Sequence, residues 1–103
     1  MLFTSEPAEA SRDADVINTD VWVSMGMEKE GDERKKAFAG FSVNEKLLQQ
    51  AKKDVIVMHC LPAHKNEEVS EAVFERFQEV IFTQAENRLH AQKALLEWLM
   101  VQI

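Results

Sequence analysis

Three side chains that could do chemistry stand at the ends of predicted strands or at the start of a predicted helix: Asp20, Cys60 and Arg88. The carboxylate of Asp20 can pair with a cation, and Cys60 follows an apolar strand and directly precedes Leu61 and Pro62. Arg88 falls in the first turns of a predicted helix, where a guanidinium and free backbone N–H groups together bind a phosphate or a carboxylate. The three side chains predict a site for a charged substrate.

Each of these residues also has an ordinary structural interpretation. Cys60 could be a small buried apolar side chain, and Asp20 could cap the turn that follows it. Arg88 could form a local ion pair on its helix surface. His59, Cys60 and His64 are zinc-ligand types, but no fourth residue has the spacing of a tetrahedral site, so we expect no metal and no cofactor.

The predicted strands explain why these residues should meet. Residues 55–59 form an apolar run typical of a buried parallel strand. Residues 16–23, rich in β-branched side chains, predict a second strand that loses its regularity near Asp20. Residues 80–82 predict a third strand, and residues 2–4 predict a short one at the start of the chain.

Helices are predicted in the segments between these strands, over residues 6–12, 27–36, 44–53, 70–77 and 83–103. Their predicted N-caps are Ser5, Asn44, Ser70 and Thr83, the last forming a capping box with Glu86. The last helix carries an apolar stripe of Ala85, Leu89, Leu96, Met100 and Ile103. Alternating strands and helices predict an α/β fold: a partial Rossmann-like parallel sheet flanked by helices, with a long C-terminal helix.

Composition narrows the function classes. The formal net charge of −6 argues against nucleic-acid and anionic-membrane partners, because both attract a basic surface. The single cysteine excludes an internal disulfide, and no apolar run approaches the roughly 20 residues of a membrane span. The first residues resemble neither a signal peptide nor a transit segment. We therefore expect a cytoplasmic protein.

Three motifs resemble the C-terminal signatures of the ornithine carbamoyltransferase family, in the family's order. They are DVWVSMG at residues 20–26, HCLPAH at residues 59–64 and QAENRLHAQKA at residues 84–94. The resemblance covers essentially the whole chain and implies that residues 1–103 are the C-terminal portion of an ornithine-binding domain. It implies transfer of the carbamoyl group of carbamoyl phosphate to the side-chain amine of L-ornithine, giving L-citrulline and phosphate.

The resemblance also implies roles for six residues. Asp20, Ser24 and Met25 would hold ornithine. Cys60, Leu61 and Arg88 would contact carbamoyl phosphate. Cys60 and Asp20 would be the catalytic pair beside the attacking amine, and a carboxylate so close to the thiol would raise the pKa of that thiol.

The family's N-terminal carbamoyl phosphate domain, with its Ser-Thr-Arg-Thr-Arg loop, has no counterpart in this sequence. The resemblance implies a trimer that serves arginine metabolism, in which the active site also takes residues from a neighbouring subunit. Without most of the phosphate-binding cations the chain alone is expected to be inactive. Its affinity for ornithine is expected to be weak, because a half-site leaves polar groups unpaired. The alternative function is a non-catalytic, truncated remnant or an interaction module that retains only the fold. Residues 24–26, which in the resemblance contact the amino-acid end of ornithine, disfavour a transferase for putrescine.

Overall fold

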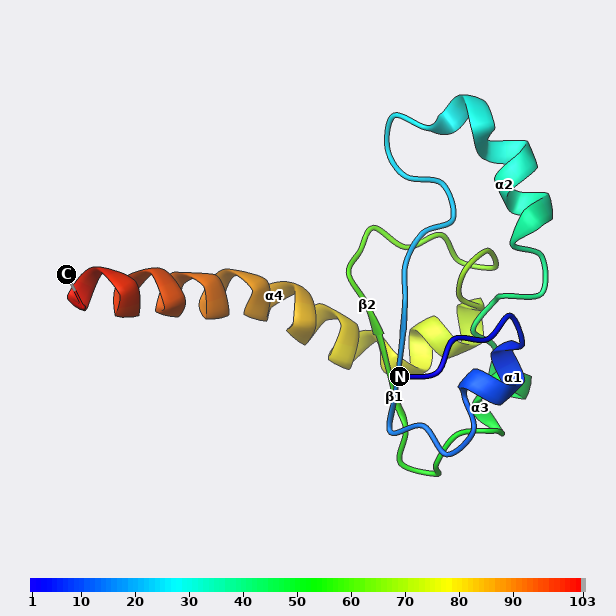
Figure 1. Ribbon diagram of the computed structural model, residues 1–103, viewed down its shortest axis with the longest axis horizontal. Helices are drawn as coiled ribbons and strands as arrows, with labels where there is room; N and C mark the ends of the chain where they lie inside the picture. The colour runs from blue at the N-terminus through cyan, green and yellow to red at the C-terminus, as the bar shows by residue number, and fades with distance from the viewer. Residues whose placement is uncertain (103) are drawn as a thin grey trace.

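A two-stranded parallel sheet packs against the first half of a long helix, whose second half extends away from the rest of the chain (Figure 1). The computed structural model describes residues 1–102. In chain order the elements are α1 (Pro7–Ala10), β1 (Val16–Thr19), the 3₁₀ helix η1 (Glu28–Glu30), α2 (Gly31–Ala37), α3 (Glu45–Leu48), β2 (Ile56–His59) and α4 (Glu71–Val101). The predicted α/β class with a parallel sheet and a long C-terminal helix is confirmed.

The sheet brings together segments that lie 40 residues apart in the sequence. β1 and β2 pair in parallel, with Val16 opposite Ile56 and Thr19 opposite His59. Both strands therefore end at the same edge of the sheet, and the next residue of each, Asp20 and Cys60, leaves the sheet at neighbouring points. This register is the first step in assembling the site.

The core lies between β2 and the first half of α4. It consists of nine buried apolar residues: Val43, Leu48, Val55, Val57, Val69, Val73, Phe74, Phe77 and Ile81. Three of these, Val73, Phe77 and Ile81, are spaced four residues apart on α4, so they form one face of the helix. Their burial fixes how α4 crosses the sheet, and hence which later residues of α4 reach the ends of the strands.

Two predicted helix starts are confirmed. The Asn44 side chain accepts a hydrogen bond from the backbone N–H of Leu47 at 2.9 Å, and the Ser70 side chain accepts one from the backbone N–H of Val73 at 3.3 Å. These caps satisfy N–H groups that have no partner inside the first turn. The helix after Asn44 is shorter than predicted: it ends at Leu48 rather than near residue 53.

The predicted strand at residues 80–82 is wrong, and so is the helix start at Thr83. α4 runs without a break from Glu71 to Val101, because burial of Ile81 on the same face as Phe77 continues the helical pattern. The β-branched residues at 80 and 81 favour a strand only weakly, and packing decides between the two structures. Thr83 and Arg88 therefore both lie in the interior of a helix.

Residues 2–4 also form no strand. The Thr4 hydroxyl accepts a hydrogen bond from the backbone N–H of Glu6 at 3.1 Å and donates one to the Glu9 carboxylate at 2.7 Å. Thr4 thus takes the place beside α1 that was predicted for Ser5, and the N-cap residue itself is Glu6, whose side chain makes no capping bond. The predicted charged helix is divided between η1 and α2.

The second half of α4 makes the whole molecule elongated (Figure 1). Every described residue from Glu86 onward is exposed, including Leu89, Leu96 and Met100 of the predicted stripe. Ile103, the last member of that stripe, lies outside the described residues. No helix within residues 1–102 is both long enough and apolar enough to cross a membrane.

Candidate functional site

Asp20 and Cys60 meet where the paired strands end. The Cys60 Sγ donates a hydrogen bond to Asp20 Oδ1 at 3.2 Å. The same oxygen accepts the backbone N–H of Val21 at 2.7 Å, so the carboxylate is held by its own chain as well as by the thiol. Asp20 is exposed and Cys60 is half-buried, which leaves the pair open to a ligand from one side.

The two groups shift each other's pKa in opposite directions. The hydrogen bond from Cys60, followed by that from the Val21 N–H, lowers the pKa of Asp20. Burial, followed by the hydrogen bond to Asp20 and the charge of Asp20, raises the pKa of Cys60. The predicted direction for the thiol is confirmed, although burial is the larger cause. At neutral pH the pair is therefore an ionised carboxylate and a neutral thiol, so Cys60 is no pre-formed thiolate nucleophile.

α4 supplies two side chains to the end of β2. The Arg88 Nη2 donates a hydrogen bond to the Cys60 carbonyl at 3.3 Å, and the Gln84 Oε1 accepts the backbone N–H of His59 at 3.0 Å. These residues are four apart, so they lie on the same side of the helix. Because Arg88 lies in the helix interior, the expected contribution of a helix N-terminus to anion binding is absent, and the exposed guanidinium is the group that remains.

The turn after β2 is held from inside the protein. Leu61 has a φ of +59°, and the peptide bond between Leu61 and Pro62 is cis. A branched residue in the left-handed region is strained by about 1 to 2 kcal/mol, so neighbouring contacts must hold it. The Leu61 N–H donates to His59 Nδ1 at 2.8 Å, and the Leu61 side chain packs against the core.

Ser24 and Met25 lie apart from the Asp20 and Cys60 pair, in the loop between β1 and η1. Both are exposed, and they line a cavity of about 320 Å³ together with Pro62 and His64 of the turn. Asp20, Cys60 and Arg88 are not among its lining residues. The structure thus brings the six predicted site residues into two neighbouring groups joined by the turn, rather than into one cavity.

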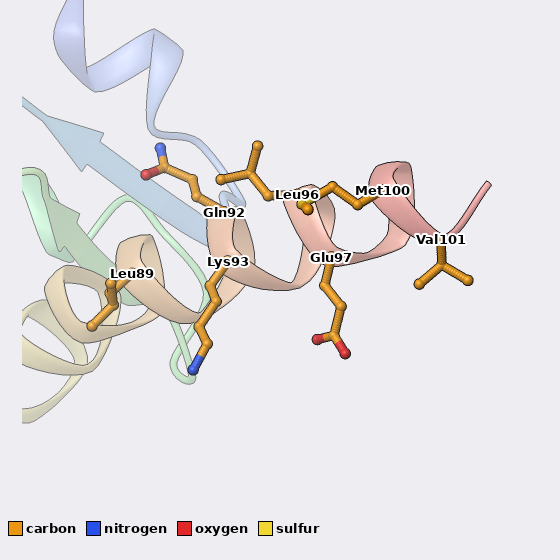
Figure 2. Close-up of a pocket in the computed structure, with 7 residues that line it drawn as sticks. All are labelled: Leu89, Gln92, Lys93, Leu96, Glu97, Met100 and Val101. Carbon is orange, nitrogen blue, oxygen red and sulfur yellow. The ribbon is translucent and has the colours of Figure 1, made fainter. Parts of the chain in front are cut away.

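A larger hollow, of about 810 Å³, lies elsewhere along α4. Seven residues of the helix line it: Leu89, Gln92, Lys93, Leu96, Glu97, Met100 and Val101. Figure 2 shows these side chains extending from α4, and all of the lining residues belong to that one helix. It is the side of an uncovered helix, and its residues carry no reactive group comparable to the Asp20 and Cys60 pair.

His59, Cys60 and His64 are the metal-ligand types that the sequence offered, but the structure gathers a different set of potential ligands. Potential ligand atoms of His64, Glu67 and Glu68 lie within 4.8 Å of one another. Glu67 pairs with Lys35 at 2.9 Å, and Glu68 Oε1 lies 2.8 Å from His59, whereas the second oxygen, Glu68 Oε2, is buried without a hydrogen-bond partner. This arrangement gives no reason to assign a metal.

Two residues that hold the site were missed by the sequence reasoning, Gln84 and Glu68. The sequence predicts Gln84 in the first turn of the last helix, with no role in the site, and it gives Glu68 no role at all. Neither has a sequence signal of its own, because each acts on a segment that only the tertiary fold brings close. Together with Arg88 they show that the site is built by α4 and by the loop before it as much as by the strands.

The fold and this site define an α/β domain with a parallel sheet whose strand ends carry a carboxylate and a thiol, with a guanidinium that reaches them from α4. Residues 1–99 match the family model of the aspartate/ornithine carbamoyltransferase Asp/Orn-binding domain. The chain belongs to the aspartate/ornithine carbamoyltransferase family.

Its relatives are much longer than the chain itself. It is 59% identical over 98 residues to an ornithine carbamoyltransferase of Oceanobacillus iheyensis, a match that covers 95% of this chain and 30% of the relative. An ornithine carbamoyltransferase of Anoxybacillus flavithermus is 58% identical over 96 residues, covering 93% and 31%. Among solved structures, the anabolic ornithine carbamoyltransferase of Campylobacter jejuni superposes with a TM-score of 0.88 at 49% identity, covering 94% of this chain and 32% of that one.

Proposed function

We propose that residues 1–103 are the C-terminal portion of the ornithine-binding domain of an ornithine carbamoyltransferase. The proposed reaction transfers the carbamoyl group of carbamoyl phosphate to the side-chain amine of L-ornithine, giving L-citrulline and phosphate within arginine metabolism in the cytoplasm. The observation that carries the proposal is the contact of Asp20, Cys60 and Arg88 at the paired strand ends. The family membership and the ornithine carbamoyltransferases among the relatives support it.

The ionised carboxylate and the neutral thiol suit an amine substrate. Asp20 would attract the side-chain ammonium of ornithine, and the Cys60 thiol beside it would orient the amine once a proton has been lost. The amine nitrogen then attacks the carbonyl carbon of carbamoyl phosphate: the C–N bond forms, the C–O bond to phosphate breaks, phosphate leaves with the electron pair, and the nitrogen gives up one N–H proton to the departing phosphate. Catalysis of this kind rests on positioning and electrostatics, without a covalent intermediate on Cys60.

The remaining residues would bind the two ends of the substrates. Arg88 offers an exposed guanidinium to the phosphate, and Leu61 would contact carbamoyl phosphate beside Cys60. Ser24 and Met25 line the cavity next to the turn, where the amino-acid end of ornithine would lie. Because Arg88 alone cannot neutralise a dianionic phosphate, the reaction would need further cations besides this guanidinium.

The test is citrulline formation from ornithine and carbamoyl phosphate. We expect no activity from the chain alone, and activity when it is mixed with the separately expressed N-terminal portion of a related ornithine carbamoyltransferase. Arg88→Ala should abolish the activity of the mixture, whereas Lys93→Ala, which removes another exposed cation five residues further along α4, should leave it unchanged. A mixture that is unaffected by Arg88→Ala would contradict the role proposed for that residue.

A non-catalytic domain that retains only the fold is the second candidate, because the proposed site residues lie in two neighbouring groups rather than in one cavity. The chain spans about a third of the length of its relatives. The same assay separates the two. If a folded sample of the chain binds the N-terminal portion of a relative but forms no citrulline, the fold is retained without the reaction.

A further inference from the structure

His59 and Glu68 form a buried polar pair directly beneath the turn that carries Cys60. The side chains of both residues are fully buried, and His59 Nε2 lies 2.8 Å from Glu68 Oε1. They are two of the three buried polar or charged residues in the described chain, the other being Ser11. Burying a carboxylate is costly unless its partners are well placed, so this pair calls for an explanation that packing does not provide.

The hydrogen bonds determine which nitrogen of His59 carries the proton. The Leu61 backbone N–H can only donate, and it points at His59 Nδ1 at 2.8 Å, so Nδ1 must accept. The proton therefore lies on Nε2, which donates to Glu68 Oε1. A carboxylate at this position stabilises that tautomer, because it accepts from Nε2–H and offers nothing to donate.

The same carboxylate oxygen also holds the far end of the turn. Glu68 Oε1 accepts the backbone N–H of His64 at 2.7 Å. One buried oxygen thus fixes the start of the turn through His59, the strained Leu61 through the imidazole, and the end of the turn directly. Cys60 lies between the first two of these points, so its side chain and its carbonyl have little freedom.

We propose that His59 and Glu68 are positioning residues, which lock the turn at residues 59–64 so that the Cys60 thiol faces Asp20 and the Cys60 carbonyl faces Arg88. Neither residue touches the proposed substrates; both act through Cys60. Their role in carbamoyl transfer rests on the proposed function, but the geometry that they impose does not, and it can be measured without substrates.

The tautomer is the first test, made on the unaltered chain by nitrogen NMR of the His59 ring. The proposal requires a pyridine-type shift for Nδ1 and a pyrrole-type shift for Nε2 at neutral pH. A pyrrole-type Nδ1, or two protonated nitrogens, would overturn it, since the Leu61 N–H would then have no acceptor.

The second test uses Cys60 as a reporter, because it is the only thiol in the chain. The rate of its alkylation by iodoacetamide is measured against pH, and the midpoint gives the pKa of the thiol. Glu68→Leu fills the same space without an acceptor, so the turn should loosen and the midpoint should fall, in the same direction as in Asp20→Asn. Glu68→Gln keeps an acceptor oxygen and should restore the midpoint.

Loss of stability alone must be separated from loss of position. Val57→Ala is the matched control. Val57 is fully buried and lies on β2, as His59 does, but its apolar side chain cannot form a hydrogen bond to the turn. It should destabilise the chain and leave the alkylation midpoint in place. An unchanged midpoint in folded Glu68→Leu would overturn the proposal, and if that variant does not fold, the tautomer measurement decides. If the tautomer and the alkylation midpoints come out as expected but no citrulline forms, the proposed function is contradicted and the positioning role of His59 and Glu68 is not.

Discussion

At the scale of single residues, the contact between Asp20 and Cys60 links the stability of the fold to pH. Since the folded state raises the pKa of the Cys60 thiol above its ordinary value of 9.0, the neutral thiol is favoured by folding. The stabilisation is fully present below the pKa of the unfolded thiol and is lost as the pH rises through the higher folded pKa. Asp20 behaves in the opposite sense, since its lowered pKa gives a contribution that is lost in acid.

We therefore expect the stability difference between the unaltered chain and Cys60→Ala to decrease as the pH is raised above 9.0. The measurement is the free energy of unfolding in urea, at a series of pH values from neutral to alkaline. Three lysines with raised pKa values, Lys35, Lys52 and Lys65, titrate in both proteins, so their effect cancels in the difference. A difference that stays constant across this range would show that folding does not raise the pKa of the thiol.

Sequence reasoning could predict the meeting of Asp20 and Cys60 because it depends only on a regular feature. Parallel strands end at one edge of a sheet, so residues that follow two adjacent strands paired in register lie close together. The contacts of Gln84 and Glu68 follow no such rule. Each depends on where α4 crosses the sheet and on how the turn folds back, which are settled by packing among residues far apart in the sequence.

At the scale of elements, α4 shows how burial overrides local preference. Residues 80–82 favour a strand by composition, and Thr83 with Glu86 imitates a helix start, yet the helix continues through both. Burial of one helix face decides in favour of the helix: Val73 and Ile81 are fully buried, and Phe77 is nearly so. This burial cannot be predicted from a short sequence window, because it depends on what the helix packs against.

The two halves of α4 should consequently respond differently to the same kind of substitution. Ile81→Ala leaves a cavity in the core and should lower the free energy of unfolding by about 2 to 5 kcal/mol. Leu96→Ala removes a side chain that is 62% exposed and should change it by less than about 0.5 kcal/mol. Urea unfolding followed by circular dichroism measures both, and similar effects at the two positions would contradict the division of the helix into a buried and an exposed half.

At the scale of the whole molecule, apolar surface that the fold leaves uncovered should govern its behaviour in solution. Leu89 is 66% exposed and Met100 is 73% exposed, on a helix that extends away from the sheet (Figure 1). The sheet has only two strands, β1 and β2, and the first residue of each, Val16 and Ile56, is exposed as well. Uncovered apolar patches and open strand edges are the usual routes to association.

We expect the chain to self-associate in a concentration-dependent manner, mainly through the exposed half of α4, because an unbroken helix there presents exposed large apolar side chains from Leu89 to Val101. Sedimentation velocity over a range of concentrations measures it. Leu96→Glu should shift the distribution toward the monomer, whereas Gln92→Glu adds the same charge to the same face without removing an apolar side chain, and should have a much smaller effect. Equal effects of the two substitutions would indicate that charge, rather than apolar contact, controls association. A monomer at every concentration would mean that neither the helix face nor the strand edges attract a second copy.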